Sequence, residues 1–273
     1  MPTILLTNDD GMGSPAIPPF ARALARIGLV RVVVPDRERS WIGKAITRHD
    51  PVEVVEVEVD GIRMHTCTGY PADATQLGIH ALFEDAPDLV VSGINVGINA
   101  GAGFLLSSGT VGAATEAWIS GVGAYAFSTG SPTADWASWA RHVRSSEATD
   151  DWVRVADVCT ALLADLVALR LHEVADVVTV NLPWEATVDT ARRVTSVARV
   201  GYDQLFRPDT PGRFVHEFGN LQAFEDLTGT DVAAFDAGEI SITPLRMPTG
   251  GDLPEGLRAA IERTGHPVVE GKS

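Results

Sequence analysis

The sequence predicts an α/β fold built on a doubly wound, mostly parallel sheet, with a β-rich appendage at its C-terminal end. Up to residue 183, short apolar runs that suit buried strands alternate with segments of helical periodicity. Such alternation produces right-handed crossovers and a parallel sheet. Beyond residue 183, strand-like runs follow one another without helices between them. We therefore expect one domain over residues 1–183 and a β-rich extension over residues 184–273.

Each expected strand is a short apolar or β-branched run bounded by polar or turn residues. These runs cover residues 4–6, 30–34, 52–59, 88–92, 124–128, 177–181, 194–200, 213–218 and 239–245. Apolar residues three and four positions apart predict a helix over residues 15–27, and a proline begins the helix expected over residues 71–83. Further helices are expected over residues 109–119, 152–171 and 255–263. A glycine-rich loop is expected over residues 93–107 and a surface loop over residues 131–151.

The composition, with 45% hydrophobic and 21% charged residues, suits a soluble globular protein. A formal net charge of -15 argues against polymeric nucleic acid as a partner, because such binding relies on basic surfaces. No apolar run approaches the ~20 residues that span a bilayer, and the residues after Met1 lack the basic segment of a secretion signal. Cys67 and Cys159 suggest no disulfide framework, so we expect a cytoplasmic protein without membrane partners.

Two adjacent carboxylates follow the first expected strand, in the segment Thr7-Asn8-Asp9-Asp10-Gly11. In an open α/β sheet, ligands bind at the carboxyl ends of the strands. Asp9 and Asp10 would repel each other there unless a positive ion lay between them, and Mg²⁺ or Mn²⁺ takes oxygen ligands of this kind. The same residues also suit an ordinary turn, because Asp and Asn are common turn residues.

Three further segments follow expected strands or begin a helix. Asn95 offers an amide oxygen and Ser40 a hydroxyl oxygen to a cation. Ser108 and Thr110 begin the helix over residues 109–119, where free N–H groups and the helix dipole favour an anion. Each segment alone would also suit a loop or a routine helix cap. Because the carboxyl ends of parallel strands meet at one edge of the sheet, we expect a single site.

Two other classes of function remain open at this point. The segment Gly11-Met12-Gly13-Ser14-Pro15-Ala16 matches the pattern of a dinucleotide-binding loop, and Asp36 follows the second strand at about the right spacing for an oxidoreductase. Against this alternative, Asp9 and Asp10 would face a pyrophosphate with no cation between them. The other alternative is a protein that binds metal and nucleotide without catalysis.

These motifs together resemble those of the SurE survival-protein family of nucleotidases, over nearly the whole chain. The matching segments are residues 8–11, 35–40, 92–95, 99, 108–114, 230–232 and 241–245. The resemblance implies a Rossmann-like catalytic domain that hydrolyses nucleoside 5′- and 3′-monophosphates or a related small phosphate ester. It also implies one divalent metal ion (Mg²⁺ or Mn²⁺) per subunit, and homodimers or homotetramers joined through the C-terminal extension.

The resemblance also implies a role for each matching residue. The metal ligands would be Asp9, Asp10, Ser40 and Asn95. The phosphate contacts would be Asn99, Ser108, Gly109 and Thr110. The residues expected to contribute to catalysis are Asp9, Asp10, Asn95, Ser108 and Thr110.

The chain departs from the family pattern at five positions. Lys44 replaces the usual His, and Ser107 replaces the usual Tyr. Tyr70, Ala72 and Ala74 stand in a segment that usually reads Thr-Pro-Thr-Asp-Cys. The expected metal ligands are unaltered, so we expect these positions to line or support the substrate pocket. They leave the identity of the phosphate ester open.

Overall fold

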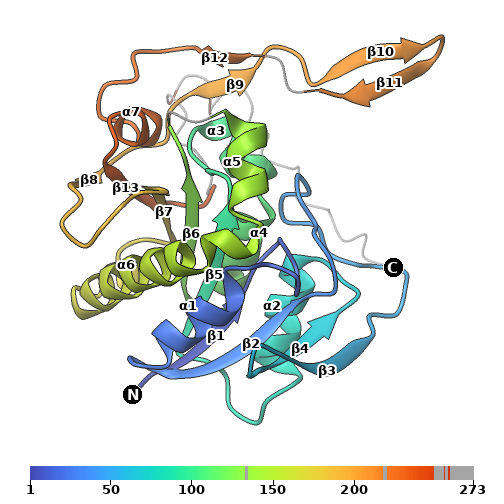
Figure 1. The fold of residues 1–273 in the computed structure, drawn as a ribbon, viewed down its shortest axis with the longest axis vertical. Coiled ribbons are helices and arrows are strands. Elements are labelled where there is room, and N and C mark those ends of the chain that lie inside the picture. The colour runs from blue at the N-terminus through green and yellow to red at the C-terminus, as the bar shows by residue number, and fades with distance from the viewer. Residues whose placement is uncertain (133–134, 218–219, 249–254, 256–257, 259–273) are drawn as a thin grey trace, which may run out of the picture.

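A computed structural model of the chain describes residues 1–132, 135–217, 220–248, 255 and 258. Within these residues, a nine-stranded sheet in the order β3-β4-β2-β1-β5-β6-β7-β13-β8 has helices on both faces (Figure 1). The strands are β1 (Thr3–Thr7), β2 (Leu29–Pro35), β3 (Val54–Val59), β4 (Ile62–Cys67), β5 (Leu89–Val96), β6 (Gly123–Gly130), β7 (Val177–Pro183), β8 (Arg192–Val194), β9 (Val200–Tyr202), β10 (Phe206–Thr210), β11 (Arg213–His216), β12 (Leu221–Ala223) and β13 (Ile240–Leu245). The helices are α1 (Ile17–Leu24), α2 (Pro71–His80), α3 (Ala102–Ser107), α4 (Gly109–Ile119), α5 (Trp136–His142), α6 (Thr149–Ala168) and α7 (Asp231–Asp236).

The sheet confirms the expected doubly wound α/β fold. Strands β4, β2, β1, β5, β6 and β7 are parallel to their neighbours, and only β3 and β13 pair antiparallel within the described sheet. The chain passes from β1 to β2 on one side, and it later returns to β5 on the other side of β1. The strand order therefore reverses between β1 and β5, and ligands bind at the carboxyl ends of strands at such a point.

Two apolar layers hold the helices against the sheet. On one face, α1 and α6 pack over a cluster in which Phe20 meets Phe127 edge to face, with ring centroids 5.9 Å apart. On the other face, α2 and α4 cover Leu5 and Val90, and small residues such as Ala113 allow the helices to approach closely. Full burial of a side chain the size of Phe20 contributes roughly 1.5–3 kcal/mol.

Strand β5 is longer than expected and contains the start of the predicted glycine-rich loop. Its register with β6 shifts between Ser92 and Asn95, and Gly93 has a φ of +127°. A Cβ at Gly93 would lie 2.3 Å from the carbonyl oxygen of Phe127, so only glycine fits this irregularity. The strand thus continues through the glycine to Asn95, and the remainder of the predicted loop includes helix α3.

The surface loop expected over residues 131–151 is wrong for most of its length. This stretch contains α5, a 3₁₀ turn (Ser146–Ala148) and the first residues of α6. Helix α5 begins at an Asp135 cap, where the carboxylate accepts a hydrogen bond from the N–H of Ser138. Its buried face presents Trp139, which packs against Trp184.

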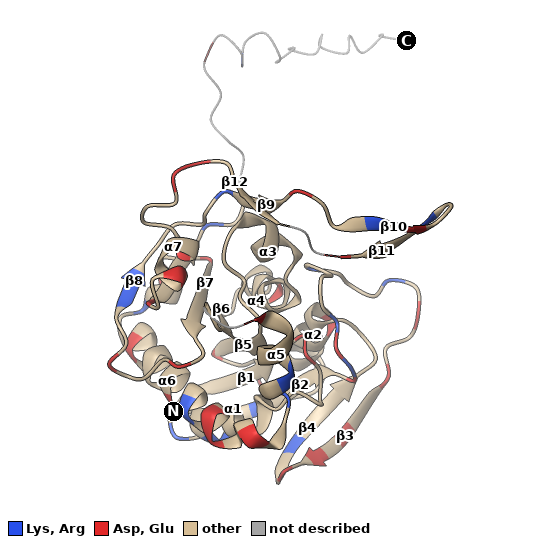
Figure 2. Cartoon of the chain, turned by 45° about the horizontal axis from the view of Figure 1, so that its top comes forward, with Lys and Arg blue, Asp and Glu red and all other residues tan. Residues whose placement is uncertain are grey.

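The C-terminal part of the chain both extends the sheet and projects from it. Strands β13 and β8 continue the main sheet beyond β7, whereas β9 pairs with β12 and β10 pairs with β11 in separate ladders. The β10–β11 hairpin projects from the body and has charged residues of both signs (Figures 1 and 2). The strand expected over residues 194–200 is wrong. The N–H of Ser196 donates a hydrogen bond to the carbonyl of Gly229, and the N–H of Ala198 donates to the side chain of Asp231 at the start of α7.

The remaining differences concern short elements. Strand β4 and helix α7 were not expected from the sequence, and the helix expected over residues 255–263 lies outside the described residues except at positions 255 and 258. The domain boundary at residue 183 stays a prediction. No helix in the described part of the chain is long and apolar enough to cross a membrane.

Candidate active site

The turn after β1 holds Asp9 and Asp10 at the carboxyl end of the strand. Asn8 closes this turn with two hydrogen bonds to the backbone of Gly11, one donated and one accepted. Gly11 has a φ of +79°, and a Cβ there would lie 2.5 Å from the carbonyl carbon of Arg37. Only glycine fits, so the Asn-Asp-Asp-Gly sequence fixes the position of both carboxylates. Asp9 is only 4% exposed.

Helix α4 begins directly beside Asp9. The hydroxyl of Ser108 caps the helix by accepting a hydrogen bond from the N–H of Val111 at 3.1 Å. The hydroxyl of Thr110 donates to Asp9 Oδ1 at 2.5 Å. A Cβ at Gly109 would lie 2.8 Å from Cβ of Asp9, so glycine is needed for this close approach. The predicted carboxylates and the predicted anion-binding helix start thus lie in contact.

Asp10 lies on the other side of the turn, toward the end of β5. Its Oδ2 accepts a hydrogen bond from the N–H of Val96 at 3.0 Å. Asn95 precedes this donor, and its Nδ2 donates to the carbonyl of Gly97 at 2.7 Å, so Oδ1 is the amide atom able to reach a cation. Nη2 of Arg144 lies 4.0 Å from Asp10 Oδ1.

Burial raises the pKa of both carboxyl groups. For Asp10 the negative charge of Asp9 adds to the burial effect, while the hydrogen bond from Val96 and the charge of Arg144 act in the opposite direction. For Asp9 the hydrogen bond from Thr110 is the main opposing influence. A bound cation would reverse this destabilisation of the charged forms.

The donor atoms at the site fit a hard divalent cation. No third His, Cys, Asp or Glu in the described part of the chain joins Asp9 and Asp10 in a metal-binding group. The further ligands would have to be hydroxyl, amide or water oxygens, which Mg²⁺ accepts alongside one or two carboxylates. Asn95 and Ser40 supply oxygens of these types.

Ser40 lies on the loop between β2 and β3. Its hydroxyl donates to Glu38 Oε1 at 2.7 Å, and its side chain is exposed. The preceding residue, Arg39, donates its N–H to the carbonyl of Asp9 at 2.7 Å and holds this loop against the carboxylate turn. The loop therefore lies beside the turn, although no hydrogen bond joins Ser40 to either carboxylate among the described residues.

Asn99 faces the neighbouring strands. Its N–H donates to Asn181 Oδ1 at 2.7 Å, and its Nδ2 donates to Ser128 Oγ at 2.8 Å. These bonds tie the loop after β5 to strands β6 and β7. Among the residues that the structure describes, no hydrogen bond joins Asn99 to Asp9 or Asp10.

Arg144 lies close to Asp10 although its sequence context does not predict this position. The residue lies in a stretch interpreted as a surface loop, so its approach to Asp10 was not anticipated. A signal was present: Asp135 is a helix cap, and Trp136, Trp139 and Val143 follow at helical spacing. That pattern predicts helix α5, but it does not reveal which residue of the sheet the following arginine meets.

The loop over residues 11–16 offers little to a dinucleotide. The N–H of Met12 donates to the carbonyl of Pro35 at 2.9 Å, and the N–H of Ser14 donates to the carbonyl of Gly11 at 3.1 Å. A pyrophosphate would need such groups to be free. The carboxylates of Asp9 and Asp10 lie immediately before this loop. The geometry therefore disfavours the oxidoreductase alternative.

Comparison with known proteins shows the family of the chain. The model of the family described as Survival protein SurE matches residues 4–204 of the chain. The chain belongs to the SurE family. It is 35% identical over 258 residues to the 5′-nucleotidase SurE of Methanopyrus kandleri, covering 92% of this chain and 93% of that protein. It is 39% identical over 248 residues to the 5′-nucleotidase SurE of Geobacter sulfurreducens, covering 89% and 87%.

A solved structure extends the relationship to three dimensions. The SurE protein from Aquifex aeolicus superposes with a TM-score of 0.71 at 30% identity, covering 95% of this chain and 98% of that one. The match covers the C-terminal part of the chain as well as the sheet. No comparison supports the oxidoreductase alternative.

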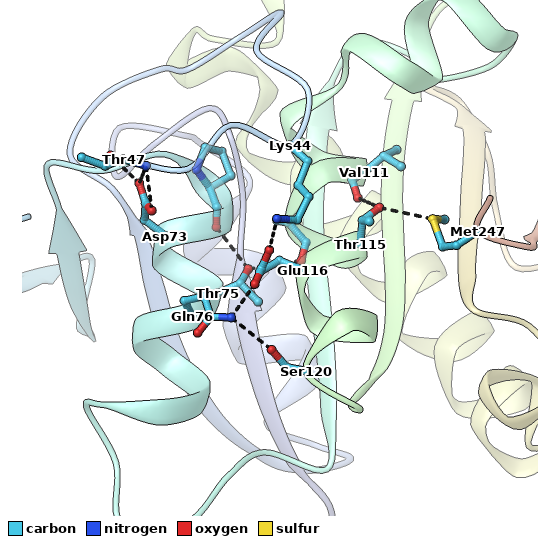
Figure 3. Close-up of polar contacts among 12 residues, drawn as sticks. Lys44, Thr47, Asp73, Thr75, Gln76, Val111, Thr115, Glu116, Ser120 and Met247 are labelled. Atoms are coloured by element: carbon cyan, nitrogen blue, oxygen red, sulfur yellow. Dashed lines mark hydrogen bonds and ion pairs between the residues drawn. The ribbon is translucent and has the colours of Figure 1, made fainter. Parts of the chain in front are cut away.

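Lys44, which departs from the SurE pattern, supports the loop that contains Ser40. Its Nζ forms an ion pair with Glu116 Oε2 between α2 and α4, and the other oxygen of Glu116 accepts a hydrogen bond from Gln76 (Figure 3). Farther along the loop, the hydroxyl of Thr47 donates to Asp73 Oδ2 at 2.6 Å (Figure 3). The loop is therefore fastened to both helices.

The other departures also occupy supporting positions. The ring of Tyr70 lies under the guanidinium of Arg39, 5.3 Å from its centre. Ala72 and Ala74 are buried in α2. The hydroxyl of Ser107 donates to the backbone within α3. Of these positions, Tyr70 is connected to the carboxylate turn through Arg39, whose N–H donates to the carbonyl of Asp9.

Proposed function

We propose that this member of the SurE family is a metal-dependent phosphomonoesterase of nucleoside monophosphates or a related small phosphate ester. The observation that carries the proposal is the contact between the turn holding Asp9 and Asp10 and the start of helix α4, through Thr110. This contact brings a cation-binding pair and an anion-binding helix start together at the point where the strand order reverses. The names of the two 5′-nucleotidase relatives support a phosphate monoester as the bond that is hydrolysed.

Asp9, Asp10, Asn95 and Ser40 would hold one divalent cation, Mg²⁺ or Mn²⁺, in each subunit. Their oxygen atoms suit these ions, and the burial of the two carboxylates supplies the electrostatic reason to bind one. When bound, such an ion polarises a phosphoryl oxygen and acidifies a water molecule. To bind the cation, the hydroxyl of Ser40 would have to give up the hydrogen bond that it donates to Glu38.

The start of α4 would hold the phosphoryl group. The helix dipole and the N–H groups of Ser108, Gly109 and Thr110 favour the charge that develops on the phosphoryl oxygens. The hydroxyl of Thr110 orients Asp9 and so links phosphate binding to cation binding. A direct role for Asn99 would require its hydrogen bond with Ser128 to be exchanged for one with phosphate.

A phosphate-release assay tests the proposal. The substrates are 5′- and 3′-nucleoside monophosphates and sugar phosphates, each with Mg²⁺, with Mn²⁺ and with a chelator. We expect metal-dependent release from at least one ester, and its loss in Asp9→Asn. Turnover that persists in excess chelator would overturn the metal assignment. No release from any ester, with metal binding intact, would favour a binding protein without catalysis.

We further propose that residues 184–273 form an oligomerisation extension of a catalytic domain over residues 1–183, giving a homodimer or homotetramer. The exposed rings of Phe206 and Phe214 on the β10–β11 hairpin support this, since exposed apolar side chains on a projecting element suit an interface. We also propose a cytoplasmic location, which the two buried, unpaired cysteines Cys67 and Cys159 support.

A further inference from the structure

We propose that Arg144 binds the phosphate group of the substrate, as a second anion-binding group facing the start of α4 across the carboxylate pair. The inference rests on the proposed phosphomonoesterase function and adds a specificity-determining residue to its site. Arg144 follows α5, which lies at the edge of the sheet toward which β6 points (Figure 1). Its Nη2 lies 4.0 Å from Asp10 Oδ1.

The charge balance of the site calls for such a group. A divalent cation at Asp9 and Asp10 would only neutralise the two carboxylates, and Glu38 adds a further negative charge nearby. A phosphate monoester carries up to two negative charges of its own at neutral pH. The phosphate therefore benefits from a positive side chain in addition to the helix start.

Other basic residues around the site have partners elsewhere. Arg39 donates from Nη2 to the carbonyl of Thr68 at 2.6 Å and lies over Tyr70. Lys44 is paired with Glu116. Arg144 differs because the carboxylate that its Nη2 approaches, at 4.0 Å, is that of Asp10 in the site itself.

The guanidinium of Arg144 is both available and well positioned. Nη1 donates to the carbonyl of Ala140 at 3.1 Å, which leaves Nε and Nη2 as a pair of donors for two phosphate oxygens. The side chain is 39% exposed, whereas that of Asp10 is 8% exposed, so the guanidinium lies on the solvent side of the carboxylate. A substrate entering from solvent would meet this group.

The backbone that supports Arg144 is firmly packed. Val143 is fully buried, and its carbonyl accepts a hydrogen bond from Nε1 of Trp152 at 2.7 Å. Trp139, one turn earlier, packs against Trp184 with ring centroids 5.9 Å apart. A residue held by a rigid support keeps its geometry during binding, as a phosphate-binding residue requires.

The geometry brackets the expected position of the phosphate. The start of α4 contacts Asp9 through Thr110, and Arg144 approaches Asp10 from the α5 side. A phosphoryl group bound beside the carboxylate pair would therefore meet the helix start at Asp9 and the guanidinium at Asp10. Two donors from Arg144 would fix its rotation, which orients the ester oxygen for displacement.

The test compares Arg144→Met and Arg144→Lys with the wild type and with Arg141→Met. Arg141 is an exposed arginine of α5 and serves as the matched control. Titration calorimetry with inorganic phosphate, in the presence of Mn²⁺, measures anion binding without turnover. Steady-state assays with the best substrate measure KM and kcat, and titration with Mn²⁺ alone measures metal affinity.

We expect Arg144→Met to weaken phosphate binding and raise KM roughly 10- to 100-fold, with Mn²⁺ affinity unchanged or higher. Arg144→Lys should recover part of the loss, and Arg141→Met should match the wild type. The proposal is overturned if Arg144→Met binds phosphate as tightly as the wild type, or if it changes Mn²⁺ affinity alone. A wild type that binds phosphate through Arg144 but hydrolyses no ester would overturn the proposed function and leave the anion site in place.

Discussion

The hydroxyl of Thr110 donates a hydrogen bond to Asp9 Oδ1 at 2.5 Å, although the two residues are 101 positions apart in the chain. Through this contact the start of α4 and the turn after β1 act as one unit. Asp9 is otherwise a buried carboxylate whose charged form is disfavoured. A single donor therefore both orients the carboxylate and favours the ionised state that a cation requires.

We predict that Thr110→Val lowers turnover by roughly 10- to 100-fold, because Asp9 loses the hydroxyl donor that orients it and a hydrogen bond to a charged group contributes about 1.5–3 kcal/mol. The loss of Mn²⁺ affinity should be smaller, because the carboxylates remain. Thr110→Ser keeps the hydroxyl and should keep most of the activity. Phosphate release and Mn²⁺ titration on both variants check this, and unchanged turnover in the valine variant would remove Thr110 from the site.

Much of this unit could be predicted from the sequence because its signals are local. The turn that Asn8 closes on Gly11 and the Ser cap before a helix at 109–119 each depend on a few neighbouring residues. Helix α4 has the expected bounds for this reason. The convergence of the turn and the helix start follows from the parallel sheet, in which the ends of the strands share an edge.

Other features depend on contacts between distant segments. Arg144 approaches Asp10 only because the Trp139 side of α5 packs against Trp184, and neither fact can be read from a Ser- and Asp-rich stretch. The passage of β5 through Gly93 depends on the carbonyl of Phe127 in the next strand. The hydrogen bonds of Asn99 likewise depend on residues of β6 and β7.

We predict that Asp10→Asn stabilises the metal-free protein at pH 8 and has little effect near pH 4. The pKa of Asp10 is raised to about 7 by burial and by the charge of Asp9. A pKa above the unfolded value, near 4, means that the folded state binds the extra proton. The contribution of Asp10 to the free energy of unfolding is therefore fully present below pH 4, and it is lost as the pH rises through about 7. The asparagine variant avoids that loss.

Thermal melting in chelator across pH 4–8 measures this effect. For a chain of this size, each 1 kcal/mol gained in the free energy of unfolding should raise the melting temperature by roughly 2–4 °C. Glu84→Gln, which alters an exposed carboxylate and keeps Asp10, is the control and should melt like the wild type at each pH. A variant that melts well below the wild type at pH 8 would show that the Asp9–Asp10 pair has a structural role.

We predict that Mn²⁺ raises the melting temperature of the wild type and has little effect on Asp9→Asn or Asp10→Asn. Binding to the folded state alone adds about 2.7 kcal/mol when the free ion is a hundredfold above its dissociation constant. Adding chelator in excess should return the wild type to its metal-free melting temperature. If both variants keep the full metal shift, Asp9 and Asp10 are residues of a turn and the cation binds elsewhere.

We predict that Lys44→Met destabilises the fold by about 1–3 kcal/mol. The side chain of Glu116 is 5% exposed, and removing its cation leaves a buried carboxylate without its ion pair. Such losses reach about 3–5 kcal/mol for fully buried pairs, and the expected value is lower because a third of the Lys44 side chain is exposed. The double variant Lys44→Met with Glu116→Gln should recover part of the stability, as urea unfolding would reveal. Equal stability of the single variant and the wild type would mean that the pair contributes nothing measurable.

The last prediction concerns the β10–β11 hairpin, which has Phe206 and Phe214 exposed. A two-stranded hairpin is marginally stable alone in water, and both rings remain more than half exposed although that of Phe206 meets His216. We expect the wild type to sediment as a dimer or tetramer at micromolar concentration, and the double variant Phe206→Ser with Phe214→Ser to sediment as a smaller species. Melting at several protein concentrations gives a second measure, because the melting temperature of an oligomer rises with protein concentration and that of a monomer does not. Leu169→Ser, which removes an exposed apolar side chain at the end of α6, is the matched control and should keep the wild-type size. A wild type that is monomeric, or a double variant of unchanged size, would assign these rings no part in assembly.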